Sequence, residues 1–265
     1  MSSDAVQLAH ARAGDIGGEA PPVLILHGLF GSKRNWAGIL NELAATRPAI
    51  ALDLRNHGES PHLARMGFEE MAADVLATAD ALGFERFSLV GHSLGGKVAM
   101  TLARKAPDRL AHLVVVDIAP VAYSDRYTPL VESLRALPND PGCSRAEIDR
   151  ALAHQVADPQ IRAFLLQNYL RTDAGWRWRL NLDALAKQMP ELMDYPAHGP
   201  VALEAPATLI AGGPTGLVHG DAHREAFLKT FPQGRIVTLP KAGHWPHVED
   251  PEAFKAALSR ALDLH

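Results

Sequence analysis

Short apolar runs of strand length recur along the chain, separated by stretches in which apolar positions return with helical spacing. Most of these runs are apolar at nearly every position, which is typical of parallel strands covered by helices on both faces. A weaker run over Val6–Arg12 is expected to pair at an edge of the sheet. The other predicted strands are Pro22–Leu26, Ala49–Leu54, Phe87–Val90, Leu110–Ile118, Ala207–Ala211 and Arg235–Leu239.

Helices are predicted between these strands. In Phe68–Leu82 the apolar residues recur every three or four positions, and Gly83 follows as the expected C-cap. A second helix is predicted over Pro251–Asp263, because a proline stands at its first position and one face is apolar. This β-α-β alternation predicts an α/β fold with a doubly wound, mostly parallel sheet.

The alternation breaks between residues 121 and 200, where no apolar run resembles a core strand. This stretch contains helix-like pieces over Pro129–Ala136, Arg145–Ala157 and Pro159–Arg171. We interpret residues 121–200 as a helical cap, or lid. Residues 1–120 and 201–265 would then form the core, because an apolar strand follows soon after residue 200.

Composition narrows the function classes. The chain has 265 residues, a formal net charge of -4 and a pI near 6.3, so its electrostatics give no reason to expect nucleic acid or an anionic membrane surface. Its single cysteine, Cys143, cannot form an intramolecular disulfide. We find no secretory signal and no apolar stretch long enough to span a bilayer, so a cytoplasmic protein is expected.

The strongest chemical signal is the segment Gly91–Gly96 (GHSLGG), which lies between a predicted strand and a helical run over Lys97–Lys105. This is the context of a nucleophile elbow, a sharp turn that projects a serine hydroxyl. Glycine at 91 and 95 removes side chains that would crowd the turn. Ser93 is therefore the predicted nucleophile, and it needs an adjacent base.

The base and the acid must come from elsewhere in the chain. His244 lies in the loop after the last predicted strand and is the expected base, with His247 as its rival. The acid is marked less clearly, because the loop Gly212–Leu217 carries no carboxylate. Asp117, which ends a core strand, is the first candidate. Asp221, interpreted as a helix N-cap, is the second.

A glycine-rich loop, His27–Gly31, directly follows the first buried strand. Such a loop can direct a backbone N–H group at the carbonyl oxygen under attack. We expect the oxyanion hole to consist of the Leu29 and Leu94 amides, with Phe30 as the alternative donor.

At these positions the chain resembles the α/β-hydrolase superfamily, and more narrowly the YbfF-type bacterial esterases and their mitochondrial relatives. The resemblance implies a small helical cap inserted after the sixth strand, Asp117 as the acid, and activity on short- to medium-chain acyl esters or acyl thioesters. It rests on the segments His27–Ser32, Asp53–Ser60, Gly91–Lys97, Asp117–Pro120 and Gly243–Trp245. Of these, Asp53–Ser60 is expected to make structural hydrogen bonds rather than to take part in chemistry.

Two further patterns are weighed. Trp176–Leu180 alternates aromatic and basic residues, and we interpret it as a lid segment over the acyl pocket, with Arg177 and Arg179 as candidates to meet coenzyme A phosphates. His219 and His223 have the spacing of metal ligands but lack a third, so no metal is predicted. The residues expected to line the substrate pocket are Phe30, Trp178 and Trp245.

The expected function is that of a serine esterase working through a Ser-His-Asp triad and an acyl-enzyme. Its substrate would be a small ester or thioester, with no cofactor and no nucleic-acid partner. A C–C bond hydrolase, a lactonase and a perhydrolase remain alternatives on the same fold, and a binding module without catalysis is the alternative outside enzymes.

Overall fold

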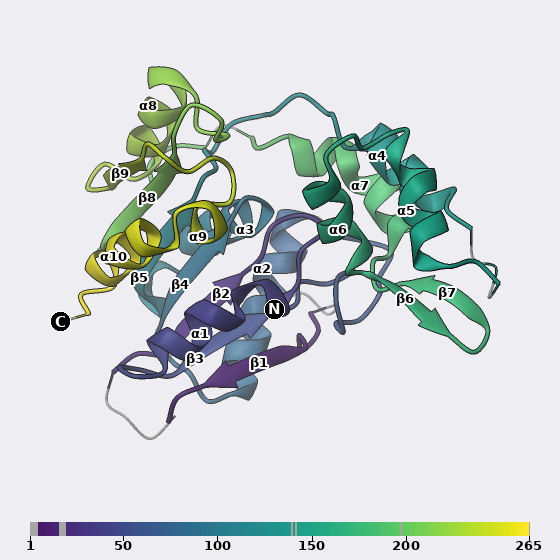
Figure 1. Ribbon diagram of the computed structural model, residues 1–265. Helices are drawn as coiled ribbons and strands as arrows, with labels where there is room; N and C mark the ends of the chain where they lie inside the picture. The colour runs from purple at the N-terminus through teal and green to yellow at the C-terminus, as the bar shows by residue number, and fades with distance from the viewer. Residues whose placement is uncertain (1–4, 16–19, 139, 141, 197, 265) are drawn as a thin grey trace.

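Seven strands form one sheet in the computed structural model, which describes residues 5–15, 20–138, 140, 142–196 and 198–264 (Figure 1). The strand order is β1-β3-β2-β4-β5-β8-β9, and every neighbouring pair is parallel except β1 with β3. The predicted mostly parallel sheet is therefore confirmed. The strands are β1 (His10–Ala13), β2 (Val23–Leu26), β3 (Ala49–Leu52), β4 (Phe87–His92), β5 (Leu110–Val116), β8 (Ala207–Gly212) and β9 (Arg235–Leu239).

The edge strand begins later than its apolar pattern predicts. The prediction covered Val6–Arg12, whereas β1 starts at His10. The backbone before it bonds to helix α2 (Phe68–Ala81) instead, since Leu8 N–H donates to the hydroxyl of Thr78. A side chain on the helix thus replaces a strand partner for that amide.

Both faces of the sheet are buried, as its continuous apolar strands predict. Successive residues of a strand point to opposite faces, so Leu24 and Leu26 pack in one apolar cluster, with α2 and α3. Val23 and Ile25 pack in the other, with α1 and α10. Figure 1 shows α1, α9 and α10 on one side of the sheet and α2 and α3 on the other. The helices around the sheet are η1 (Lys33–Trp36), α1 (Ala37–Leu43), α2, α3 (Leu94–Lys105), η2 (Pro107–Arg109), α8 (Gly220–Thr230), α9 (Pro246–Glu249) and α10 (Pro251–Ala261).

The segment between β5 and β8, here called the cap, lies to one side of the sheet (Figure 1). Five strands precede it within the described ranges, whereas the family resemblance counted it after a sixth strand. Three of its helices lie where the sequence predicts them, although α5 and α6 end earlier than expected. The cap elements are α4 (Thr128–Arg135), α5 (Arg145–Ala153), α6 (Pro159–Leu166), β6 (Tyr169–Thr172), β7 (Gly175–Trp178) and α7 (Leu182–Met193).

The hairpin β6–β7 and the helix α7 depart from the predicted helical pieces. The residues of β6 had been assigned to the end of a helix, but Tyr169 stacks on Trp176 and Trp178 across the antiparallel pair. Aromatic residues at alternating positions contact one another across a pair of strands, and these contacts favour a hairpin over a helix in this segment. Gly175, at φ 117°, supplies the turn conformation that other residues rarely adopt.

The segment Asp53–Ser60 is structural, as expected. The Asp53 carboxylate accepts hydrogen bonds from the backbone and the ammonium of Lys33 and from the backbone of Glu59. Gly58 has a φ of 58°, and a Cβ atom there would lie 2.2 Å from the Asp53 carboxyl carbon. The turn is therefore fixed around a buried carboxylate.

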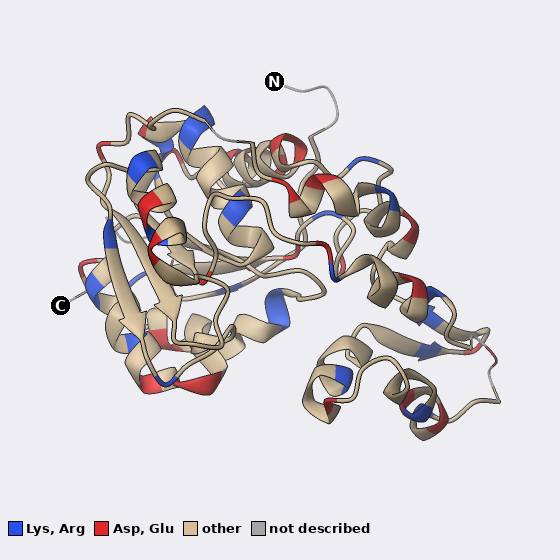
Figure 2. Ribbon diagram, turned by 90° about the horizontal axis from the view of Figure 1, so that it is seen from above, with Lys and Arg blue, Asp and Glu red and all other residues tan. Residues whose placement is uncertain are grey.

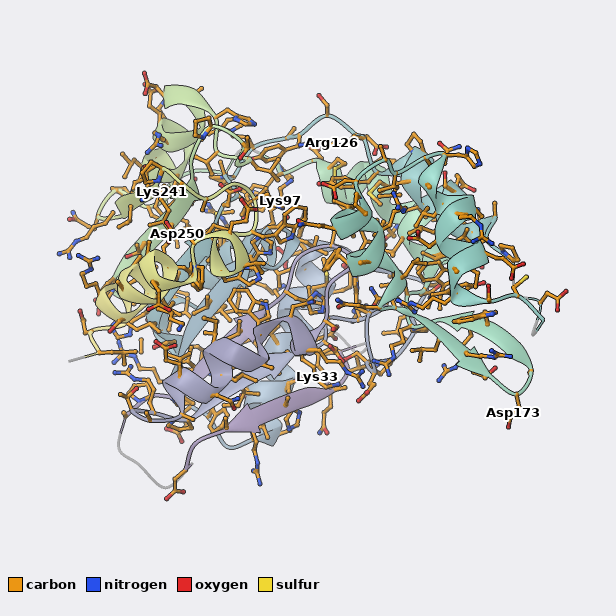
Figure 3. The ribbon with its side chains drawn as sticks, in the orientation of Figure 1. Lys33, Lys97, Arg126, Asp173, Lys241 and Asp250 are labelled. Atoms are coloured by element: carbon orange, nitrogen blue, oxygen red, sulfur yellow. The ribbon has the colours of Figure 1, made fainter. Side chains whose placement is uncertain are left out.

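Lys97 joins α3 to the cap, and Figure 3 labels it near the middle of the molecule, where the core and the cap meet. Its buried ammonium donates to the backbone carbonyls of Leu192, Met193 and Asp194 at the end of α7, at 3.0–3.3 Å. Burial lowers the pKa of Lys97 to about 8, with Asp194 opposing the shift. The ammonium also lies 5.2–5.8 Å from the ring centroids of Phe68, Tyr123 and Tyr195.

Four histidines lie beneath the carboxyl ends of the strands; His27, His57 and His92 are buried, and His247 is half-buried. His27 and His57 each use Nε2 to accept a backbone hydrogen bond, from Leu54 and Phe30 respectively. His92 contacts the backbone of the loop after β9, and His247 stacks on Trp36. Burial lowers the pKa of His27 and that of His92, and it lowers the pKa of His57 to about 3 and that of His247 to about 4. All four rings are therefore neutral near pH 7.

Charged residues of both signs are mixed over the core and the cap (Figure 2). None of the helices in the described ranges combines the length and the apolar composition that a membrane crossing requires. The mixture of both signs agrees with the small formal net charge of -4.

These neutral histidines predict a loss of stability in acid. The unfolded chain binds a proton at each ring below about pH 6.5, whereas the folded chain does not until pH 3–4 at His57 and His247. Each such ring makes the free energy of unfolding fall by about 1.4 kcal/mol per pH unit within that window. In His247→Phe the stacking on Trp36 remains and the urea-measured slope between pH 6 and 5 should fall by that amount. The exposed variant His154→Phe should keep the wild-type slope, and an equal slope in all three proteins would contradict this account.

The Lys97 contacts predict that this one side chain contributes measurably to the stability of the folded protein, beside the other hydrogen bonds between core and cap. Lys97→Met keeps the apolar stem but leaves three carbonyls without their donor, so the free energy of unfolding should fall by about 1–3 kcal/mol. Lys187→Met, an exposed substitution on α7, is the matched control and should stay within about 0.5 kcal/mol of wild type. Urea unfolding at pH 7 measures both, and equal effects would show that the buried ammonium contributes nothing.

Candidate active site

Ser93 occupies a sharp turn between β4 and α3. Its φ of 53° and ψ of -117° are unusual for a residue with a side chain, and such a conformation costs about 1–3 kcal/mol. A Cβ atom on Gly91 would lie 2.2 Å from the carbonyl oxygen of Gly95, and one on Gly95 would lie 2.7 Å from His27 O. Both glycines are therefore required by close backbone approach, as the elbow pattern predicts.

Asp117 is the first residue after β5, also with a positive φ of 47°. Its carboxylate is fully buried and accepts hydrogen bonds from Gly212 N–H, from Leu217 N–H and from His244 Nδ1, at 2.7–2.9 Å. Burial alone would raise the pKa of Asp117, but the His244 bond and charge and the two amides lower it below its ordinary value. A Cβ atom on Gly216 would lie 2.6 Å from Asp117 Oδ1. The loop Gly212–Leu217, which has no carboxylate of its own, therefore encloses the carboxylate of Asp117.

His244 lies in the loop after β9, with 15% of its side chain exposed. Its carbonyl oxygen contacts Nε2 of His92, the residue before Ser93, at 2.7 Å. Glu249 holds the loop on both sides of His244, because its carboxylate accepts from Gly243 N–H and from Trp245 N–H. Sequence reasoning missed Glu249. Its place in the turn before the last helix was the available signal.

The rival residues occupy other places. His247 is half-buried and stacks on Trp36, and its Nδ1 has no hydrogen-bond partner among the described residues. Asp221 is exposed in the first turn of α8, and the N-cap of that helix is His219. The prediction that Asp221 caps the helix is therefore wrong. A carboxylate in the first turn still favours the positive end of the helix dipole.

The glycine-rich loop after β2 packs against the elbow. A Cβ atom on Gly28 would lie 3.1 Å from Ser93 Cβ, so a larger residue would push the loop away. Phe30, at φ 62°, donates its N–H to Nε2 of His57. That bond leaves Leu29 as the available donor in this loop, since none of the described residues accepts a hydrogen bond from its N–H.

A cavity opens at Ser93 between the core and the cap. It brings together the elbow, Leu29 and Leu94 with residues of the link from β5 to α4 and of the end of α7. The contribution of this link was not predicted, because residues 121–127 show neither strand nor helix periodicity. The lining residues are Leu29, Ser93, Leu94, Lys97, Ile118, Tyr123, Ser124, Arg126, Tyr127, Leu192, Met193 and Leu217.

The three residues expected to line the pocket lie around this cavity and are not in its wall. Phe30 is buried one layer behind it, edge-on to the lining residue Tyr127 at 6.1 Å between ring centroids. Trp178 packs inside the cap, where its Nε1 donates to the backbone of α4. Trp245 lies beside His244, and its ring centroid is 6.1 Å from that of Phe164 in the cap.

Two further candidate sites are not assembled. His219 and His223 lie on one side of α8, where His219 N–H donates to Nδ1 of His223. Within the described ranges, no group of three or more His, Cys, Asp or Glu residues could hold a metal ion. Arg177 and Arg179 belong to β7 and the residues after it and do not line the cavity at Ser93.

Comparison with known proteins agrees with this architecture. Residues 21–169 match the family described as the alpha/beta hydrolase fold. The chain is 36% identical to the sn-1-specific diacylglycerol lipase ABHD11 of Mus musculus, over 91% of this chain and 81% of that protein. It is 32% identical to esterase YbfF of Escherichia coli (strain K12), over 91% and 93%. A solved structure titled marine microorganism esterase superposes with a TM-score of 0.91 at 31% identity, covering 97% of this chain and 99% of that one. The chain belongs to the α/β-hydrolase family.

Proposed function

We propose that the protein is a serine esterase that hydrolyses short- to medium-chain carboxylic esters and acyl thioesters. Ser93 is the nucleophile, His244 the base and Asp117 the acid that orients it. The observation that carries the proposal is the 2.8 Å contact between His244 Nδ1 and Asp117, on the strand end adjacent to the Ser93 turn. The printed names of its relatives, an esterase and a lipase, support the same class of reaction.

In the proposed reaction, His244 removes the Ser93 proton as the serine oxygen attacks the ester carbonyl. The Leu29 and Leu94 amides stabilise the oxyanion, and the buried Asp117 charge stabilises the imidazolium. His244 then protonates the leaving alcohol, which yields an acyl-enzyme. Water resolves that intermediate by the same route. No step requires a cofactor, and the reactants are a small ester and water.

The nucleophile is tested by Ser93→Ala. Turnover of p-nitrophenyl esters should fall by about 10³-fold or more, because the covalent route is lost. A chain-length series should show the highest wild-type kcat/KM at short to medium acyl chains. Ser133→Ala, in a cap helix outside the cavity, should keep wild-type turnover. Turnover that survives in Ser93→Ala would remove the proposal, and activity confined to lactones or C–C substrates would favour those alternatives.

The acid is tested by comparing Asp117→Asn with Asp221→Asn. An asparagine at 117 loses the charge and no longer fixes the imidazole tautomer, so kcat should fall by about 10³–10⁴-fold. Asp221 lies on the exposed first turn of α8, and its variant should retain kcat within about twofold. The reverse order of effects would assign the acid to residue 221.

A further inference from the structure

The cavity at Ser93 carries positive charge without a compensating carboxylate in its lining. Among its lining residues, Lys97 and Arg126 are cationic and none is Asp or Glu. A second hollow continues from it and is lined by Tyr123, Ser124, Arg126, Leu217 and His219. Arg126, which Figure 3 labels, therefore lines both hollows. It belongs to the link between β5 and α4.

The two cations have different roles. All three donors of the Lys97 ammonium have backbone carbonyl partners at the end of α7, so Lys97 adds a positive field without a free donor. Arg126 is exposed, and within the described ranges no carboxylate lies within ion-pair distance of it. Its guanidinium carbon lies 5.8 Å from the Tyr127 ring centroid, a contact that leaves its N–H groups free to bind an anion.

The neighbouring carboxylates are occupied by other partners. Asp125 accepts from Tyr127 N–H, Thr128 N–H and the Thr128 hydroxyl, which fixes it at the start of α4. Asp117 is enclosed by its own loop and by His244, and Asp194 accepts from Tyr195 N–H. Each of these three carboxylates keeps its charge, but none of them forms an ion pair with Arg126 among the described residues.

An arginine binds a carboxylate through two parallel N–H···O bonds. We infer that Arg126 binds a carboxylate carried by the substrate, so that the preferred substrates are esters with an acidic group a few atoms from the scissile carbonyl. This inference rests on the proposed esterase function and specifies its substrate class. The carboxylate could belong to the acyl half or to the alcohol half, and the same arginine would bind either.

The test uses matched pairs of anionic and neutral esters. The acyl pair is mono-p-nitrophenyl glutarate and p-nitrophenyl valerate, and the alcohol pair is 4-acetoxybenzoate and its methyl ester. Wild type is compared with Arg126→Gln and with Arg145→Gln, which removes an exposed cap arginine outside both hollows. The quantity measured is the ratio of kcat/KM for the anionic ester to that for the neutral one.

In Arg126→Gln this ratio should fall by about 10- to 100-fold for at least one pair, and the pair that falls identifies the half that carries the carboxylate. Arg145→Gln should keep the wild-type ratio. Equal ratios in wild type and Arg126→Gln for both pairs would overturn the inference while neutral esters are still hydrolysed. Absence of wild-type turnover of the neutral esters would instead count against the proposed function.

Discussion

The parallel pairing of β4 with β5 decides where the proposed catalytic groups lie. His92 and Val116 are register partners at the ends of these strands, and Ser93 N–H donates to Val116 O. The next residue of each chain segment, Ser93 and Asp117, takes a positive φ. The backbone ladder therefore sets both side chains at one edge of the sheet. Ligand sites of open α/β sheets form at this edge, because loops there leave the strands in different directions.

Around this edge, glycines let backbone segments pack closer together than larger side chains would allow. Glycines at 91 and 95 permit the serine turn, and Gly212 and Gly216 let a loop close over the Asp117 carboxylate. The enclosed carboxylate stays charged because two amides and His244 bind it. Of the neutral histidines under the loops, His27, His57 and His92 make hydrogen bonds to the backbone without adding charge. Their lowered pKa values are expected to make this edge sensitive to acid.

The sequence predicts the core well, because strands buried on both faces are apolar at almost every position and cannot be mistaken for loops. Local patterns also predict Ser93 and His244 as nucleophile and base, because a nucleophile elbow requires flanking glycines and the base is expected in the loop after the last strand. Asp117 and Asp221 stayed open until a family resemblance was considered, because the distance between a buried carboxylate and its enclosing loop is not a local property. The hairpin β6–β7 was missed, since its aromatic residues gain their partners only across the pair.

The cap supplies what the core lacks, namely a wall for the cavity and a free cation at its rim. One of its attachments is Lys97, which follows the elbow by a few residues and reaches the end of α7. The proposed nucleophile, Ser93, is the N-cap of α3, the helix that carries Lys97.

The central proposal is that Ser93 is an activated nucleophile. A fluorophosphonate probe followed by peptide mass spectrometry tests this directly: the account predicts one adduct per chain, on the peptide containing Ser93, whereas an adduct on another residue or none at all would contradict it.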